Sequence, residues 1–448
     1  MLEKADLGFN TRKLKYSIGK INKKVKSFED NSINLTVYGV TKNEGITITG
    51  NEASFDLSEY IVISENMFAY NPYRVNIGSI GLTPKGINGI VSPAYVVFKV
   101  KKDINPEFLL RYLKSKIGLQ LINLYGNRGG VRNALRFEDL GEIDFPDLTI
   151  NEQNEAIKKL KKIDSDFIKL QTEIEYQKSF IKKLRQAILQ KAIQGKLVPQ
   201  NPKDEPVSEF LATIKSERRK TKINNEIKNH ILLSKINEDE KMFDIPYNWS
   251  WIRIIEIGII NPRNNNISDD KKVSFIPMKY ISEKYNVKPI FEEKTWGEVK
   301  TGFTHFQNND VVIAKITPCF ENSKCAVMKN LVNGFGAGTT ELHVFRTINK
   351  IIEPEFLYIF FKTPLFLNSG EKKMTGSAGQ KRVPKEFIEQ YPIPLPPLAE
   401  QKRIVKKVDN LMKLCNDLEK QVEESKINAE KLMQSVLQES FSKKKKNK

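Results

Sequence analysis

The chain has 448 residues, of which 40% are hydrophobic and 28% charged, a balance typical of a soluble globular protein with room for about two to four domains. Lys and Arg number 73 against 54 Asp and Glu, and the net charge of +19 favours a polyanionic partner. Nucleic acid is favoured over a membrane surface, because the sequence has no Trp- or Phe-rich basic amphipathic helix and no apolar stretch long enough to span a bilayer. The N-terminus has no apolar signal region, and Cys319, Cys325 and Cys415 fit no metal site or disulfide framework, so we expect a cytoplasmic protein with reduced thiols.

The chain contains two copies of one long unit. The run Ile104–Leu109 returns almost unchanged as Ile352–Leu357, at an offset of 352 − 104 = 248 residues. The same offset carries Glu152-Gln153 onto Glu400-Gln401 without a gap. Solenoid and propeller repeats have periods of about 20–50 residues. The offset therefore indicates a whole domain and a long helix that have been duplicated together.

Five segments follow one another along the chain. Residues 1–150 hold short β-branched runs between Gly and Asn turns, followed by a helix from Pro106 to about Tyr125. Residues 151–200 form a long helix that ends at Gly195 and Pro199, and residues 201–242 form a connector with a polar helix. Residues 243–395 repeat the mixed pattern, and residues 396–448 repeat the long helix. The predicted fold is α+β: two mixed α/β domains separated by two long helices.

The apolar positions of both long helices step mostly by three and four residues, which gives a narrow heptad-like stripe. A narrow apolar stripe of this length needs a partner, and the matched copy is the simplest one. We predict an antiparallel coiled coil with a pseudo-two-fold internal repeat, which holds the two mixed domains a fixed distance apart. The alternative is that each stripe packs separately against its own mixed domain. The predicted pairing residues are Leu160, Phe167, Leu170, Ile174, Leu184, Val408, Cys415, Leu418, Val422 and Leu432.

The motifs that would indicate catalysis are weak or missing. Gly334-Phe-Gly336-Ala-Gly338 resembles a cofactor-binding glycine loop, but strand-like alternation follows it where such a loop requires a helix. No phosphate-binding Gly-x-x-x-x-Gly-Lys-Ser/Thr loop occurs, and His230, His305 and His343 are too scattered for a metal site. We therefore expect a non-catalytic chain that binds no metal and no cofactor.

Two Gly-rich basic loops at corresponding places in the two copies are suited to contact DNA. Their glycines allow close approach of the backbone, Arg pairs with guanine, Asn or Gln pairs with adenine, and Lys holds phosphates. The alternative for each loop is a solvated surface turn. The sequences upstream of these two loops differ more between the copies than the rest of the repeat does, which suggests that each copy reads a different base sequence. The predicted DNA-binding residues are Asn71, Arg74, Asn76, Arg128, Arg132, Asn133 and Arg136 in the first copy, and Lys315, Asn322, Lys324, Ser377, Gln380, Lys381 and Arg382 in the second.

Four passages resemble the specificity subunit of type I restriction–modification systems over essentially the whole chain. They are residues 393–409, residues 184–199, residues 374–384 and the Ile245-Pro-x-x-Trp249-x-Trp251 pattern. The resemblance implies two target-recognition domains, each reading one half of a bipartite target in double-stranded DNA, and a helical pair that sets the spacer between the halves. It also implies two modification (methyltransferase) subunits that bring S-adenosylmethionine, and restriction-translocase subunits that use ATP and magnesium.

One departure and two alternative functions remain. The first copy lacks the Pro-x-x-Trp pattern present at Pro246 and Trp249, so its N-terminus is divergent or incomplete. A coiled-coil scaffold would bind nucleic acid through charge alone, with the same affinity for target and scrambled duplexes. A self-sufficient methyltransferase or nuclease would be active as a single chain, and we expect no such activity.

Overall fold

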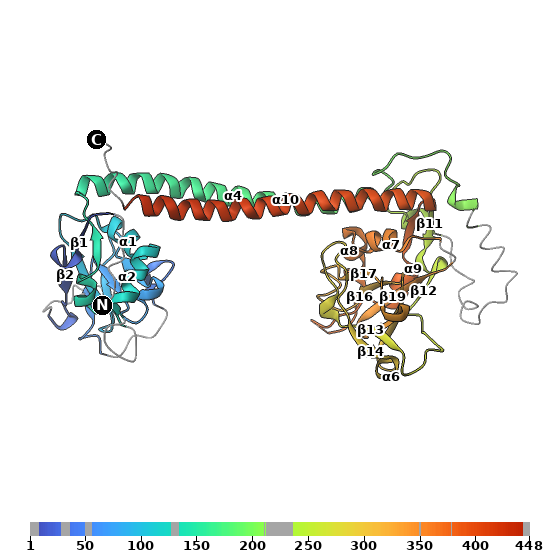
Figure 1. The fold of residues 1–448 in the computed structure, drawn as a ribbon, viewed down its shortest axis with the longest axis horizontal. Coiled ribbons are helices and arrows are strands. Elements are labelled where there is room, and N and C mark those ends of the chain that lie inside the picture. The colour runs from blue at the N-terminus through green and yellow to red at the C-terminus, as the bar shows by residue number, and fades with distance from the viewer. Residues whose placement is uncertain are drawn as a thin grey trace. The chain divides into compact units, whose positions relative to one another are not determined.

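The structure is a computed structural model that describes residues 9–27, 36–49, 56–126, 134–209, 211, 236–348, 351–377 and 379–441. It divides into two compact units, one formed by Met1–Glu175 with Glu423–Lys448 and the other by Tyr176–Val422. The division falls inside both long helices. Each unit therefore joins one of the predicted mixed domains to adjoining parts of both helices (Figure 1).

The described residues of the first unit form three small sheets. In the first, β1 (Thr11–Lys13) pairs antiparallel with β10 (Asp144–Pro146). The second sheet has the order β2 (Ile18–Ile21), β9 (Val96–Val100), β6 (Phe68–Tyr70), β7 (Ile80–Leu82). The third has the order β4 (Gly45–Ile48), β3 (Val37–Thr41), β8 (Gly89–Val91), β5 (Ile61–Ile63), and in it β3 and β8 run parallel.

The second unit repeats this topology strand for strand. Here β11 (Ser250–Arg253) pairs with β20 (Pro392–Leu395). The two larger sheets have the orders β12 (Gly258–Ile260), β19 (Leu342–Thr347), β16 (Val311–Ala314), β17 (Cys325–Val327) and β14 (Glu292–Thr295), β13 (Lys272–Ile276), β18 (Phe335–Gly338), β15 (Thr304–Gln307). The parallel pair recurs as β13 with β18. The duplication expected from the sequence thus extends to strand order and direction.

The helices also correspond between the units. Asn105 caps the helix that starts at Pro106 by accepting a hydrogen bond from the Phe108 amide at 3.1 Å, and a proline likewise opens the corresponding helix of the second unit, at Pro354. The helices are α1 (Pro106–Lys114), α2 (Lys116–Gly126), α3 (Phe137–Gly141) and α4 (Ile150–Ile193), then α6 (Trp296–Val299), α7 (Pro354–Phe361), α8 (Pro364–Lys373), α9 (Lys385–Gln390) and α10 (Leu398–Glu439). Short 3-10 turns lie at Leu14–Tyr16, Val25–Ser27, Val75–Ile77, Glu238–Glu240, Ile254–Glu256, Met278–Tyr280 and Val332–Gly334.

Gly195 ends α4 in a left-handed conformation, with φ of +69°. A Cβ at this position would lie 2.4 Å from Pro246 Cγ, so the close packing of the second copy's Pro-x-x-Trp segment also requires glycine here. The indole nitrogen of Trp249 donates to Glu400 Oε2 at 2.9 Å near the start of α10. The Pro246-x-x-Trp249 pattern therefore fastens the connector between the copies to both long helices.

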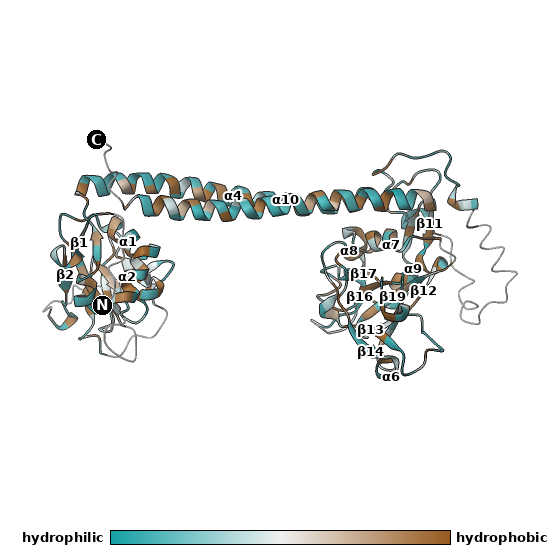
Figure 2. Ribbon diagram, viewed as in Figure 1, coloured by the Kyte–Doolittle hydropathy of each residue, from teal (hydrophilic) through white to brown (hydrophobic). Residues whose placement is uncertain are grey.

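The long helices α4 and α10 form an antiparallel coiled coil. In the second unit Arg185 donates to Asn416 at 2.8 Å, and Gln200 donates to Glu400 at 2.6 Å. Residues later in the first partner therefore contact residues earlier in the second, which is the antiparallel arrangement. Ile181 and Ile188 lie in one core with Val408 and Cys415. Along both helices, apolar and polar residues alternate in bands (Figure 2).

The apolar stripe is less continuous than the sequence suggests. Of the predicted pairing residues, Leu184, Val408, Cys415 and Val422 belong to or pack against the core of the second unit; Ile174 is buried and Phe167 half-buried. Leu160 packs among Phe108, Tyr112 and Phe145 in the core of the first unit, as the alternative interpretation requires. Leu170, Leu418 and Leu432 have exposed fractions of 42%, 44% and 66%, so they are not buried between the helices. Heptad spacing places a residue near the seam but does not bury it.

A fully buried glutamine near the start of each long helix makes the same three hydrogen bonds in both units. Gln153 donates to the carbonyls of Asp103 at 3.1 Å and Leu148 at 2.9 Å, and accepts from the Asn105 amide at 2.9 Å. Gln401 makes the corresponding bonds with the carbonyls of Ile351 and Pro396, and with the Glu353 amide. Each side chain thereby fixes the segment before α1 or α7 to a long helix.

The end of α10 packs into the core of the first unit. Phe441 is fully buried, with its ring 5.4 Å from that of Phe108 and 5.1 Å from that of Tyr112, both in edge-to-face contact. Burying a phenylalanine stabilises by about 1.5–3 kcal/mol, and edge-to-face pairs add about 0.5–1.5 kcal/mol. The C-terminal helix is therefore part of the first copy's core.

We predict that Gln401→Leu destabilises the second unit by about 2–4 kcal/mol, because it leaves one buried amide and two buried carbonyls without their partner. Amide hydrogen exchange near residues 351–353 measures the loss. Gln186→Leu, on an exposed position of α4, is the matched control and should change the free energy of opening by less than about 0.5 kcal/mol. Equal protection in both variants would contradict this role of Gln401.

Candidate nucleic-acid interface

In the second unit the structure brings the two predicted DNA-binding segments together. One follows β16 and begins at Lys315, and the other lies between α8 and α9. The Val383 amide donates to the Lys315 carbonyl at 2.8 Å, and the Thr317 amide donates to the Lys381 carbonyl at 3.0 Å. Residues that are more than 60 positions apart in the sequence therefore form one continuous surface.

The first unit has the same arrangement. The segment after β6 starts at Asn71, and the Leu135 amide donates to the Pro72 carbonyl at 3.0 Å. Tyr70 also holds Leu135 in place, because its buried hydroxyl donates to the Leu135 carbonyl at 3.2 Å. The backbone next to Arg136 thus lies against the loop that carries Arg74. Arg128, Arg132 and Asn133 lie outside the described residues.

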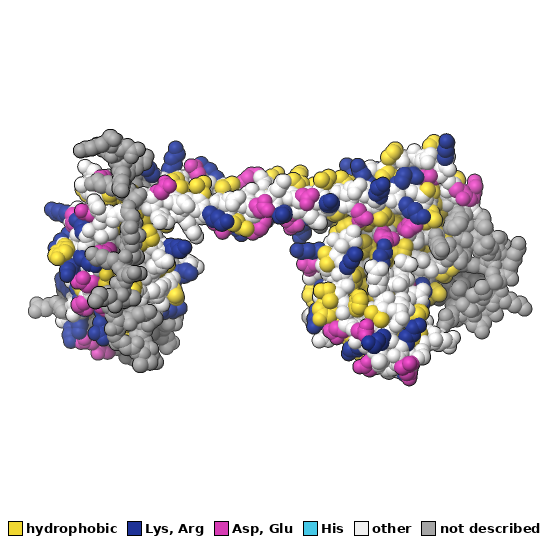
Figure 3. Space-filling view, viewed as in Figure 1, with side chains coloured by type: hydrophobic (Ala, Val, Ile, Leu, Met, Phe, Trp, Pro, Cys, Tyr) yellow, Lys and Arg dark blue, Asp and Glu magenta, His cyan; other side chains and the backbone are white. Residues whose placement is uncertain are grey.

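The predicted residues differ in how accessible they are. Asn71 accepts from the Tyr73 amide at 3.0 Å and so shapes its own turn. Lys324 donates to the Met278 carbonyl at 3.3 Å. The half-buried members are Asn71, Asn76, Lys315 and Lys324, and the exposed members are Arg74, Arg136, Asn322, Ser377, Gln380 and Lys381. On the face drawn in Figure 3, Lys and Arg are interspersed with Asp and Glu over both units.

Arg382, one of the predicted DNA-binding residues, is engaged with a carboxylate of the same unit. Its guanidinium makes a two-pronged ion pair with Glu341, at 2.9 Å from Nε to Oε2 and 2.8 Å from Nη2 to Oε1. The hydrogen bonds from Arg382 lower the pKa of Glu341, and those to Glu341 raise the pKa of Arg382. The ion pair occupies the Nε and Nη2 edge of the guanidinium, and Nη1 donates to the Gln380 carbonyl at 3.1 Å. Arg382 fastens the loop to the sheet.

Two glycines give the second unit's loop its shape. Gly376 and Gly379 have φ values of +121° and +77°, conformations that disfavour a side chain. A Cβ on Gly376 would also lie 2.9 Å from the Gln380 carbonyl oxygen. These glycines hold Ser377 and Gln380 on an exposed turn.

The sequence interpretation missed Lys362, which lies just after α7 and has an exposed fraction of only 6%. Its ammonium donates to the carbonyls of Glu283 at 2.9 Å and Ser323 at 2.7 Å, and lies 5.2 Å from the centre of the Tyr358 ring. Burial lowers the pKa of Lys362 to about 8. The first copy has a lysine at the corresponding position, Lys114, under the same offset of 248. This repetition was the sequence signal that could have drawn attention to Lys362.

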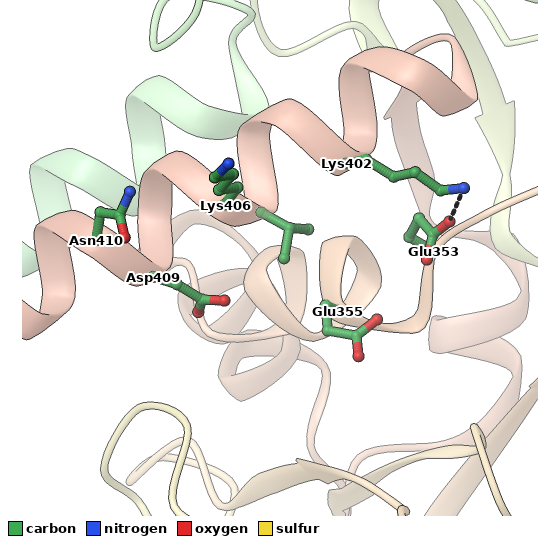
Figure 4. Close-up of a pocket in the computed structure, with 7 residues that line it drawn as sticks. Glu353, Glu355, Lys402, Lys406, Asp409 and Asn410 are labelled. Atoms are coloured by element: carbon green, nitrogen blue, oxygen red, sulfur yellow. Dashed lines mark ion pairs between the residues drawn. The ribbon is translucent and has the colours of Figure 1, made fainter.

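A groove of about 410 Å³ lies where α7 approaches α10 (Figure 4). Its charged lining residues are Glu353, Glu355, Lys402, Lys406 and Asp409. Lys402 pairs with Glu353 at 3.4 Å, Lys329 pairs with Glu355, and Asp409 accepts from the Tyr285 hydroxyl at 2.9 Å. Burial raises the pKa of Asp409. Of the charged lining residues, Lys402 and Glu353 therefore pair with each other, while Glu355 and Asp409 bond residues outside the lining.

The two described histidines serve the fold. His343 Nε2 lies 2.9 Å from the Val383 carbonyl, and His305 Nε2 lies 3.0 Å from the Lys300 carbonyl. Burial lowers the pKa of both. Within the described residues no cluster of three or more His, Cys, Asp or Glu could hold a metal ion. In the same part of the chain, no helix is both long and apolar enough to cross a bilayer.

Residues 9–177 and 246–428 both match the family described as type I restriction modification DNA specificity domain. The chain belongs to this family. The two matches cover both copies and most of both long helices, so the internal repeat consists of two specificity domains.

The chain is also similar to individual specificity subunits in sequence and in fold. The chain is 52% identical over 241 residues to the type I restriction enzyme EcoAI specificity subunit of Escherichia coli; the match covers 54% of this chain and 41% of the relative. The crystal structure of the HsdS subunit from Thermoanaerobacter tengcongensis has 17% identity and a TM-score of 0.60, over 98% of both chains. A chain from a structural study of complex assembly and conformational transition in the type I R-M system has 15% identity and a TM-score of 0.59, over 97% of both. These two likenesses show a common fold.

Lys362 generates a prediction about pH. Its pKa is about 8 in the folded protein and 10.5 as the ordinary value, so above pH 8 the unfolded chain binds more protons and the stability contribution rises with pH. We expect the free energy of unfolding of the wild type, relative to Lys362→Met, to increase by about 2 kcal/mol between pH 7.5 and 9.5. Denaturant titration at several pH values measures it. A difference that does not change with pH would contradict the lowered pKa.

Proposed function

We propose that this chain is the non-catalytic DNA-specificity subunit of a type I restriction–modification complex, and that each unit reads one half of a bipartite double-stranded target. The observation that carries the proposal is the presence of two family domains in one chain, each with the same pair of segments joined into one surface. A protein that reads two half-sites needs two such surfaces.

The surfaces supply the chemistry that base reading requires. Arg74 and Arg136 are exposed in the first unit and can present a planar fork to guanine. Gln380 is exposed in the second unit and can pair with adenine, while Lys381 beside it can hold a phosphate. The segments after β6 and β16 differ in sequence, which supports half-sites with different base sequences.

The coiled coil of α4 and α10 sets the length of the non-specific spacer between the half-sites. Two modification subunits bind the complex and bring S-adenosylmethionine, and restriction-translocase subunits bring ATP and magnesium. This chain supplies recognition and binds none of these cofactors. A scaffold that binds DNA through its +19 charge alone is the competing function.

The test uses the assembled complex and the methylated sequence found by long-read sequencing of a host with and without this subunit. Gln380→Ala should reduce discrimination at one base pair of one half-site by about 1–3 kcal/mol. Lys381→Ala should weaken binding to all sequences alike and lower the slope of log affinity against log salt by about 1.

Lys196→Ala, on an exposed lysine beyond the end of α4, is the control and should change neither quantity. Equal affinity of the wild-type complex for target and scrambled duplexes, with a steep salt slope, would establish the scaffold and end the proposal.

A further inference from the structure

Lys362 joins two segments that lie far apart in the sequence of the second unit. Glu283 belongs to the connection between β13 and β14, and Ser323 belongs to the connection between β16 and β17. The second connection is the one that starts at Lys315 and carries Asn322 and Lys324. One buried ammonium therefore holds the proposed reading segment against a neighbouring loop, through bonds to main-chain oxygens that do not depend on the side chains in either loop.

The hydrogen bond from Lys362 to the Ser323 carbonyl supports a residue with an unfavourable backbone conformation. Ser323 has a φ of +56°, a conformation that disfavours residues other than glycine. Its amide donates to the Phe320 carbonyl at 2.8 Å, and its hydroxyl donates to the Glu283 carbonyl at 3.4 Å. The contact with Lys362 completes a set of bonds that stabilises an otherwise unfavourable turn next to Asn322.

The partner loop is itself fixed to two helices. The Tyr285 hydroxyl donates to Asp409 on α10 at 2.9 Å, and the Asn286 amide donates to the Tyr358 hydroxyl on α7 at 2.7 Å. The chain of contacts therefore runs from α10 through residues 283–286 to Lys362 and on to Ser323. A rigid support of this kind keeps the reading segment in one conformation.

The first unit has a corresponding lysine, which makes one main-chain hydrogen bond where Lys362 makes two. Lys114 lies just 248 residues before Lys362 and donates to the Lys42 carbonyl at 3.1 Å, in the turn between β3 and β4. That turn is the counterpart of the β13–β14 connection. Both copies thus have a lysine at the end of α1 or α7 that bonds the main chain of this connection. The further bond from Lys362 to the Ser323 carbonyl belongs to the second copy.

From these contacts we infer that Lys362 is a positioning residue for base recognition: it fixes residues 316–324 in the conformation that reads the second half-site, without touching DNA itself. The inference rests on the proposed function. It differs from a role in folding alone, because a residue that only stabilises the unit would change how much complex is active and leave its base preferences intact.

The experiment compares base preferences at both half-sites for assembled complexes containing wild type, Lys362→Met or Lys372→Met. It measures methylation of a duplex library randomised at the target positions. Lys372 lies on an exposed position of α8 and serves as the control. Lys362→Met should reduce discrimination at one or more positions of the second half-site by about tenfold and leave the first half-site within about twofold.

Tyr285→Phe covers the case in which Lys362→Met does not assemble. It keeps Lys362, removes only the hydroxyl bonded to Asp409, and should broaden the same half-site to a smaller extent. Base preferences equal to wild type in Lys362→Met, or in Tyr285→Phe if only that variant assembles, would overturn the inference, whatever the total activity. A wild-type complex without base preference at either half-site would instead contradict the proposed function.

Discussion

In each recognition module, one uncharged buried side chain joins the same segment to the start of a long helix. Gln153 and Gln401 each satisfy one amide and two carbonyls that would otherwise be buried without partners, so the start of a long helix and the segment before α1 or α7 are held in one arrangement. The sheets and their loops are built onto that segment. The orientation of the reading surface within each unit therefore depends on this contact, which an apolar core alone would leave less well defined.

The two modules share their framework and differ in the parts that face outward. Strand order, the order of the helices from α1 to α4 and from α7 to α10, and the glutamine contacts are the same in both units. The second unit adds the Arg382–Glu341 ion pair and the second hydrogen bond of Lys362, both of which hold the segments near its reading surface. Arg136, the residue before α3 in the first unit, is exposed. A constant framework with loops that are held differently allows one fold to recognise unrelated base sequences.

The sequence was sufficient for the architecture and insufficient for the surface. Repetition at one offset revealed the duplication, and Gly195 and Pro199 predicted the end of a long helix that the structure ends at Ile193. Periodicity could not show that Leu432 is exposed, because spacing defines a helix face and the surrounding chain determines its burial. The ion pair of Arg382 could not be foreseen because its partner Glu341 lies 41 residues away in the sequence. Lys362 was missed because a lysine is normally a surface residue, and its burial depends on loops that converge only in the fold.

The central claim is that the two modules read DNA independently on one shared coiled coil. The most direct measurement exchanges residues 11–146, from β1 to β10, for the corresponding segment of another family member and determines the methylated sequence in the host genome. The exchange leaves Gln153 and both long helices in place. The account predicts that one half-site changes while the other half-site and the spacer stay the same. A change in both half-sites, or in neither, would contradict it.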